Sequence, residues 1–170
     1  RGLGATRCGR CGATSAGRCA RRALRPPSVG PVAADDKVAN ESTARVSSRL
    51  SGTDLDGRFH RLGENPQCPA TVVVFLATEC PISNESVPGL TRMAAAYAKR
   101  QVQFFGVISD QTLARADALR HRDEFRIGFP VLFDPAGELA RQLRATHTPQ
   151  AVVLDPDGRI VYSGAIDDRY

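Results

Sequence analysis

Cys80 stands directly before Pro81, at the end of an apolar, β-branched run over residues 71–77. Such a run is short for a helix and typical of a strand that is covered on both faces. Proline ends a strand and suits the first turn of a helix. Cys80 is therefore expected at a strand-to-helix junction, where the helix N-terminus favours a thiolate. The sequence predicts a nucleophilic cysteine, against the alternative of a small, buried apolar residue.

Three polar residues near the predicted strand ends are candidate modulators of this thiol. His147 precedes another buried-strand run and could stabilise the thiolate or relay a proton. Glu79 would oppose thiolate formation by like charge, and Asp110 could act as an acid at the edge of the site. Each also has a simpler interpretation as a solvated loop residue, or as a helix N-cap for Asp110.

Alternating strands and helices are expected to position these residues. Apolar runs predict strands over 71–77, 102–108, 129–133, 151–154 and 160–165, and 3.6-residue periodicity predicts helices over 84–99, 112–125 and 137–143. The turn signal at 155–159 predicts that the last two strands form an antiparallel hairpin, and Asp56-Gly57 predicts an earlier hairpin over 54–62. This order indicates an α/β sheet with parallel crossovers and a terminal antiparallel hairpin.

The helix expected over 84–99 follows the cysteine and should pack on the sheet. Its predicted apolar face consists of Val87, Leu90, Met93, Ala94 and Tyr97. Pro88-Gly89 should kink it into a short first arm behind the cysteine and a longer second arm.

Charge is concentrated at the start of the 170-residue chain. Residues 1–34 hold seven arginines and no acidic residue, so removing them from the net charge of +5 leaves residues 35–170 at −2. The high arginine content therefore does not indicate a nucleic-acid partner. No apolar run approaches the length of a membrane span.

Residues 1–48 contain almost no large apolar side chains and are predicted to be disordered, with a folded domain over 49–170. The leader has no apolar core of a secretory signal. Its arginine-rich start is weakly similar to an organelle transit peptide, and a frame error or a GC-rich leader sequence is at least as good an explanation. Its Cys8, Cys11 and Cys19 lack a nearby fourth ligand, which favours incidental thiols over a zinc site or a redox pair. No metal or cofactor is expected.

Cys68 is separated from Cys80 by a predicted strand of roughly 20 Å, so a disulfide between them is not expected. A small, partly buried apolar role is expected for Cys68.

Four features together resemble one family. They are the strand leading to Cys80-Pro81, Pro88 eight residues after the cysteine, Thr148-Pro149 before a late strand, and the turn at 155–158. Residues 49–170 thereby resemble a bacterial thioredoxin-like domain of the redoxin type, the group of alkyl hydroperoxide reductase and thiol-specific antioxidant proteins.

The resemblance implies a thioredoxin-like fold, a central mixed sheet flanked by helices. It also implies a cis Pro149 that faces Cys80, and a substrate held by Pro81, Ser83, Thr148 and Pro149. Because such folds usually close with one more helix, a C-terminal helix is expected beyond the sequence shown. The resemblance is compatible with an extracytoplasmic location, for which the sequence shows no signal peptide.

Two departures from the family pattern bear on the chemistry. Ser83 stands where the resolving cysteine of the family belongs, and Ala77 where peroxidases of the family carry a threonine. The expected function is therefore an enzyme, a thiol-disulfide oxidoreductase with the single nucleophile Cys80. Its partners would be a disulfide-containing protein or a small thiol or peroxide, and an external reducing thiol. A partner-binding module without catalysis is the alternative, and a one-cysteine peroxidase with an antioxidant role is the third.

Overall fold

The protein is described by a computed structural model that covers residues 50–63 and 65–167. The predicted leader over 1–48, with Cys8, Cys11 and Cys19, lies outside the described residues, so its predicted disorder and the domain boundary stay predictions. The strands and helices of the described part are β1 (Ser51–Thr53), β2 (Phe59–Arg61), β3 (Thr71–Leu76), α1 (Pro81–Ala98), β4 (Gln103–Ile108), α2 (Arg115–Glu124), β5 (Val131–Phe133), α3 (Glu138–Gln142), β6 (Gln150–Leu154) and β7 (Ile160–Ala165).

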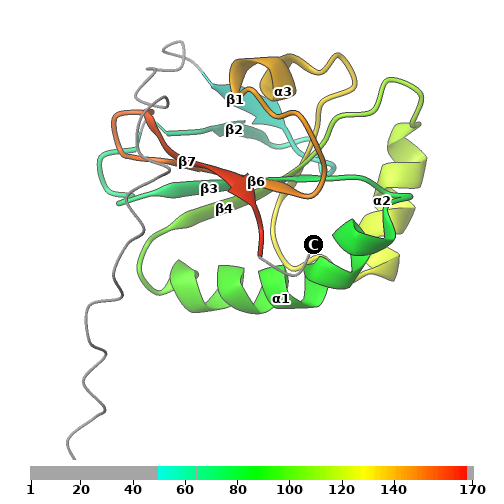
Figure 1. Cartoon of the computed structure of the whole chain (residues 1–170), viewed down its shortest axis with the longest axis horizontal. Helices are drawn as coiled ribbons and strands as arrows, with labels where there is room; N and C mark the ends of the chain where they lie inside the picture. Colours follow the sequence, from blue (N-terminus) through cyan, green and yellow to red (C-terminus); the bar gives the residue numbers. More distant parts are fainter. Residues whose placement is uncertain (1–49, 64, 168–170) are drawn as a thin grey trace, which may run out of the picture. The chain divides into compact units, whose positions relative to one another are not determined.

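A mixed five-stranded sheet forms the centre of the domain, in the order β5-β4-β3-β6-β7. β3 pairs in parallel with β4, and β4 with β5, whereas β6 runs antiparallel to both β3 and β7. This topology confirms the parallel crossovers and the terminal hairpin that the sequence predicts. Figure 1 shows α1 and α2 on one side of the sheet, and α3 with the β1–β2 hairpin on the other.

The residues of β3 alternate between two hydrophobic clusters, because successive side chains of a strand point to opposite faces. Val73 and Phe75 belong to the cluster beneath α3, whereas Val74 and Leu76 belong to the cluster beneath α1 and α2. All four side chains are at most 2 % exposed. Burial of a side chain of this size stabilises a fold by ~1.5–3 kcal/mol. Burial of the apolar run therefore determines the position of β3, and the position of Cys80 after the strand follows from it.

Helix α1 begins at Pro81, directly after the cysteine and before the periodic stretch from residue 84. Pro88 lies inside it, and Figure 1 shows the helix changing direction along its length, as the sequence predicts. The predicted apolar face is wrong for Met93 and Tyr97, which are 45 % and 42 % exposed. The buried face instead follows Val87, Leu90 and Ala94, from which Met93 is rotated, whereas Tyr97 lies close to the line of Leu90 but in the last turn of the helix.

Several predicted boundaries shift by a few residues. The first hairpin pairs 51–53 with 59–61, so its strands start earlier than the predicted 54–62. The intervening turn closes through N–H groups bonded to the Asp54 carboxylate and through Gly57, whose φ is +83°. Glycine adopts this left-handed conformation without the steric cost of a Cβ. The predicted closing helix beyond Tyr170 also lies outside the described residues.

Candidate functional site

Cys80 lies where the sequence predicts it, between the end of β3 and the start of α1. Its backbone is extended, with φ −86° and ψ 112°, and it forms the N-cap of α1 without a capping hydrogen bond from its own side chain. The side chain is partly exposed. The first N–H groups of a helix have no intrahelical partner and carry partial positive charge, so Cys80 lies beside free backbone donors.

Side chains at the start of α1 form hydrogen bonds with the backbone of the turn that carries the cysteine. The Ala77 N–H donates to the Ser83 hydroxyl over 3.2 Å, and the Asn84 side-chain amide donates to the Thr78 carbonyl over 3.0 Å. The Cys80 N–H reaches the Ala77 carbonyl at 3.3 Å. Two residues of the helix therefore hold the strand end and the turn from one side.

Ser83 is fully buried in this arrangement, with 0 % of its surface exposed. Its hydroxyl faces the end of β3 and accepts a backbone hydrogen bond there. A substrate could touch this side chain only after a local opening, so the substrate-binding role of Ser83 stays a prediction that the burial does not support. The exposed Pro81 has a surface that a substrate can reach.

The Thr148–Pro149 peptide bond is cis, which confirms the prediction that the resemblance implied. The loop also lies against the cysteine, because the Cys80 Sγ is 4.0 Å from the Thr148 carbonyl oxygen. Residues 68 positions apart in the sequence therefore meet at one surface site. The roles of Thr148 and Pro149 in substrate binding remain predictions.

The three predicted modulators lie at the surface, and none has a described contact with the Cys80 sulfur. Glu79 and His147 are exposed, and His147 Nδ1 lies 3.1 Å from the Thr146 hydroxyl. The Asp110 carboxylate accepts hydrogen bonds from the Thr112 hydroxyl and N–H, which hold the pKa of that carboxyl below its ordinary value. Asp110 thus closes a local turn; the N-cap of α2 is Ala114.

A comparison with protein families matches residues 45–163 to the model of the AhpC/TSA family. The chain belongs to the AhpC/TSA family. A comparison with curated protein sequences gives no match.

Solved structures similar to this AhpC/TSA chain have the same fold. An uncharacterised conserved protein from Geobacillus kaustophilus has a TM-score of 0.67 and 27 % identity, over 75 % of this chain and 70 % of its own. A putative thiol:disulfide interchange protein DsbE from Chlorobium tepidum has a TM-score of 0.64 and 20 % identity, over 74 % and 85 %. A secreted disulfide oxidoreductase from Mycobacterium tuberculosis has a TM-score of 0.55 and 21 % identity, over 66 % and 81 %. The fold is therefore thioredoxin-like, and the family match supports a thioredoxin-like redox function.

Gln150 is a residue beside the candidate site that the sequence analysis missed. It is 3 % exposed, and its Oε1 accepts the N–H groups of Thr146 and His147 over 2.8 and 3.3 Å. Its amide donates to the Ser163 hydroxyl on β7 over 2.9 Å. Gln150 thereby anchors the loop before Pro149 to the sheet. A polar side chain at the start of an apolar strand was the signal that could have found it.

His121 is the second missed residue. It lies on α2, is 6 % exposed, and its Nε2 is 2.7 Å from the Asn84 Oδ1. Burial lowers the pKa of His121 below its ordinary value, and the nearby charge of Glu124 opposes this change only in part. His121 is therefore a neutral imidazole at neutral pH. His121 lies three residues after Ala118 and four before Phe125, the spacing of one helix face, and this spacing is the sequence signal for its burial.

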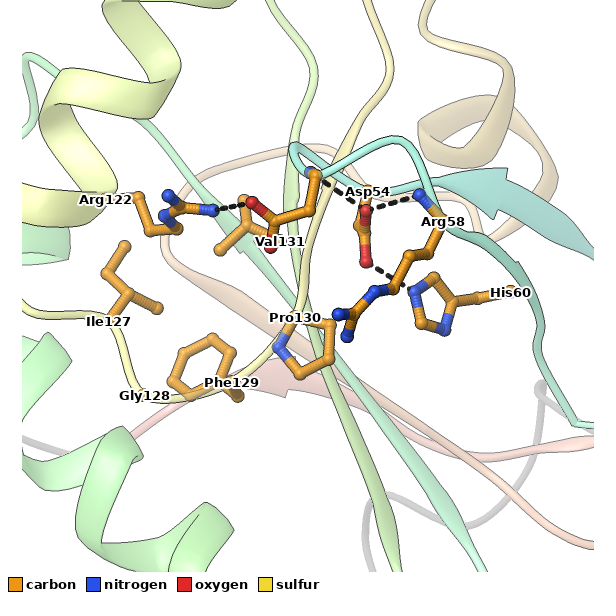
Figure 2. A pocket seen from close by; sticks show the side chains of 10 residues that line it. Asp54, Arg58, His60, Arg122, Ile127, Gly128, Phe129, Pro130 and Val131 are labelled. Atoms are coloured by element: carbon orange, nitrogen blue, oxygen red, sulfur yellow. Dashed lines mark hydrogen bonds and ion pairs between the residues drawn. The ribbon is translucent and has the colours of Figure 1, made fainter.

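A separate concavity of about 360 Å³ lies between the first hairpin, Arg122 and the segment 127–131. Figure 2 shows its centre, the Asp54 carboxylate, which accepts from His60 Nε2 over 2.6 Å and from two backbone N–H groups of the turn. Burial raises the pKa of Asp54, but these hydrogen bonds outweigh it and leave the pKa below its ordinary value. This network stabilises the hairpin, and none of the predicted site residues lines the concavity.

Within residues 50–63 and 65–167, no group of three or more His, Cys, Asp or Glu side chains could hold a metal ion. Over the same residues, none of the helices has the length and apolar character needed to cross a bilayer. Cys68 is buried, and both it and Cys80 are free thiols, as predicted.

Proposed function

We propose that the domain is a thiol-disulfide oxidoreductase that acts through the single nucleophile Cys80. The observation that supports this most is the meeting of a partly exposed helix-capping cysteine with the cis-Pro149 loop. The loop beside the cysteine offers backbone groups to a substrate chain.

The proposed reaction begins when the Cys80 thiolate attacks one sulfur of a substrate disulfide. The bond from Cys80 to that sulfur forms, the substrate S–S bond breaks, and the other substrate sulfur leaves as a thiolate that takes up a proton. The product is a mixed disulfide on Cys80. Since Ser83 occupies the position of a resolving cysteine, an external thiol must attack the mixed disulfide and release the substrate in reduced form.

The alternative is a module that binds a peptide or a partner domain at the same surface, beside Cys80 and the cis-Pro149 loop. The observation in its favour is Ser83, whose hydroxyl is buried and engaged by the backbone instead of being a thiol. A one-cysteine peroxidase is the third function. There, Cys80 would be oxidised by a hydroperoxide to a sulfenic acid, and the hydroperoxide reduced to an alcohol.

Mass spectrometry after incubation with glutathione disulfide distinguishes these functions. The full chain should be compared with Cys80→Ser, and with Cys68→Ser as a matched control at the buried thiol. Peptide mapping reports Cys80 separately from the leader cysteines. We expect a glutathione adduct on Cys80 and insulin reduction that Cys80→Ser abolishes and Cys68→Ser retains.

The other outcomes decide between the alternatives. An inert Cys80 refutes the oxidoreductase and leaves the binding module. Rapid consumption of a hydroperoxide with a sulfenic acid on Cys80, but without insulin reduction, supports the peroxidase.

A further inference from the structure

His121 is a buried polar side chain with only one of its two ring nitrogens engaged. Nε2 meets the Asn84 Oδ1 at 2.7 Å, whereas the buried Nδ1 has no hydrogen-bond partner among the described residues. One face of the ring packs against Phe125, with 4.7 Å between the ring centroids. Buried polar atoms are almost always hydrogen-bonded, and an unpaired one lowers stability. An aromatic hydrocarbon of similar size would fill this place without that penalty.

The hydrogen-bond directions show what the engaged nitrogen does. The Thr78 carbonyl oxygen can only accept, so the Asn84 amide must turn its Nδ2 toward it, at 3.0 Å. The Oδ1 then faces His121, and since Oδ1 also only accepts, Nε2 must carry the proton. Rotation of the amide by half a turn would place two oxygens against each other. The tautomer of His121 and the orientation of Asn84 are therefore set together.

The hydrogen bonds lead from His121 through Asn84 to the turn that carries Cys80. Asn84 also donates its backbone N–H to the Cys80 carbonyl at 3.0 Å, so one residue grips the turn at Thr78 and at Cys80. His121 supplies the only described hydrogen bond to the Asn84 Oδ1, and it comes from a different helix. Without that donor, the amide could rotate and release the Thr78 carbonyl.

We propose that His121 is a positioning residue for Cys80. Through Asn84 it fixes the Thr78 carbonyl, and thereby the backbone that aims the sulfur at the cis-Pro149 loop. This inference rests on the proposed function of Cys80. It explains why a histidine with an unpaired nitrogen occupies a buried position of α2: the orientation that it gives to Asn84 requires an N–H donor at this place.

The test compares the rate of Cys80 alkylation by iodoacetamide with the thermal stability of the full chain. His121→Phe keeps a ring but removes the donor, and His121→Gln places an amide N–H close to the position of Nε2. Phe125→Leu is the matched control, because it disturbs the packing of the same ring without touching the hydrogen bonds. Peptide-resolved mass spectrometry gives the rate at Cys80 alone.

In His121→Phe we expect alkylation of Cys80 to slow by about three- to tenfold, as for the loss of one ordinary hydrogen bond, while the melting temperature stays equal or rises. His121→Gln should stay within about twofold of the wild-type rate, since it restores the donor. Asn84→Ala should slow alkylation as much as His121→Phe does, and the double variant should be no slower than Asn84→Ala alone.

Two results separate the inference from the proposed function. If Cys80 of the wild type does not react, the proposed function fails. If it reacts, and His121→Phe lowers the melting temperature but leaves the rate unchanged, or Phe125→Leu slows the reaction equally, His121 has a structural role only and the inference is overturned.

Discussion

Replacement of Gln150 by leucine should loosen the loop before Pro149 while leaving the strand in place. Leucine has a similar volume and suits the buried end of β6, but it accepts no hydrogen bonds. The N–H groups of Thr146 and His147, which now lie 2.8 and 3.3 Å from the Gln150 Oε1, lose their acceptor. The loop backbone then loses the two hydrogen bonds that join it to the start of β6.

The size of the effect follows from the exposure of the two donors. An unpaired, fully buried donor costs ~1–3 kcal/mol, whereas an ordinary hydrogen bond contributes a net ~0.5–1.5 kcal/mol. Because Thr146 and His147 are exposed, water can reach their N–H groups in the variant, and the lower range applies. The variant also loses the bond from the Gln150 amide to Ser163, so three such bonds give a loss of ~1.5–4.5 kcal/mol in the free energy of unfolding.

Urea unfolding and amide hydrogen exchange measure the two parts of this prediction. Ser163→Ala is the matched control, since it removes the third bond of Gln150, to β7, and keeps the loop bonds. We expect Gln150→Leu to lose more stability than Ser163→Ala, and to exchange faster at Thr146 and His147 only. If these amides exchange as in the wild type, or both variants lose equal stability, Gln150 does not anchor the loop.

Three further predictions concern the thiol site and the pH dependence. Ser83→Cys should shorten the lifetime of the glutathione adduct on Cys80 by at least about tenfold, as followed by mass spectrometry, because an adjacent thiol has a high effective concentration; an unchanged lifetime would contradict a resolving geometry. The free energy of unfolding should fall as the pH drops below ~6.5, because the pKa of His121 is lower in the folded than in the unfolded chain, and the unfolded chain therefore binds the proton first. His121→Phe should flatten this dependence in urea titrations at different pH values, and an equal slope in the variant would assign the dependence to other groups. Asp54→Ala should destabilise the domain by ~1–4 kcal/mol in the same titrations near neutral pH, since three hydrogen bonds of the hairpin turn lose their acceptor, and a variant as stable as the wild type would refute the role of the turn.

The sequence predicted those features that depend on neighbouring residues. The run of Val and Phe residues in β3 is buried on both faces, and Pro81 opens α1 directly after the cysteine. Both follow from local sterics and burial, which the sequence displays directly. The cis bond before Pro149 came instead from the family resemblance, since local sequence alone rarely distinguishes cis from trans.

The missed and wrong predictions depend on contacts between distant segments. The hydrogen bond of His121 to Asn84 joins residues 37 positions apart, so the spacing of His121 on its own helix marks its burial but not its partner. Met93 was assigned to the apolar face of α1 from its periodicity, but 45 % of it is exposed because the sheet covers a narrower stripe of the helix. Which of several apolar positions is buried is decided by the packing partner, which a single helix sequence does not contain.

The surroundings of Ser83 indicate whether this residue has a structural role of its own or only marks the absence of a second cysteine. A hydroxyl is a better hydrogen-bond acceptor than a thiol, and the Ser83 hydroxyl accepts the N–H of Ala77, the first residue after β3. Without this acceptor, the N–H would be left at the end of the sheet beside the reactive turn. Ser83 therefore has a structural role of its own: it binds the end of β3, while Asn84 binds the turn that follows. These two bonds support the backbone around Cys80, so the serine at the position of the expected resolving cysteine contributes to the structure of the candidate site. Under the proposed function, Ser83 then supports the nucleophile's backbone while the second thiol comes from another molecule.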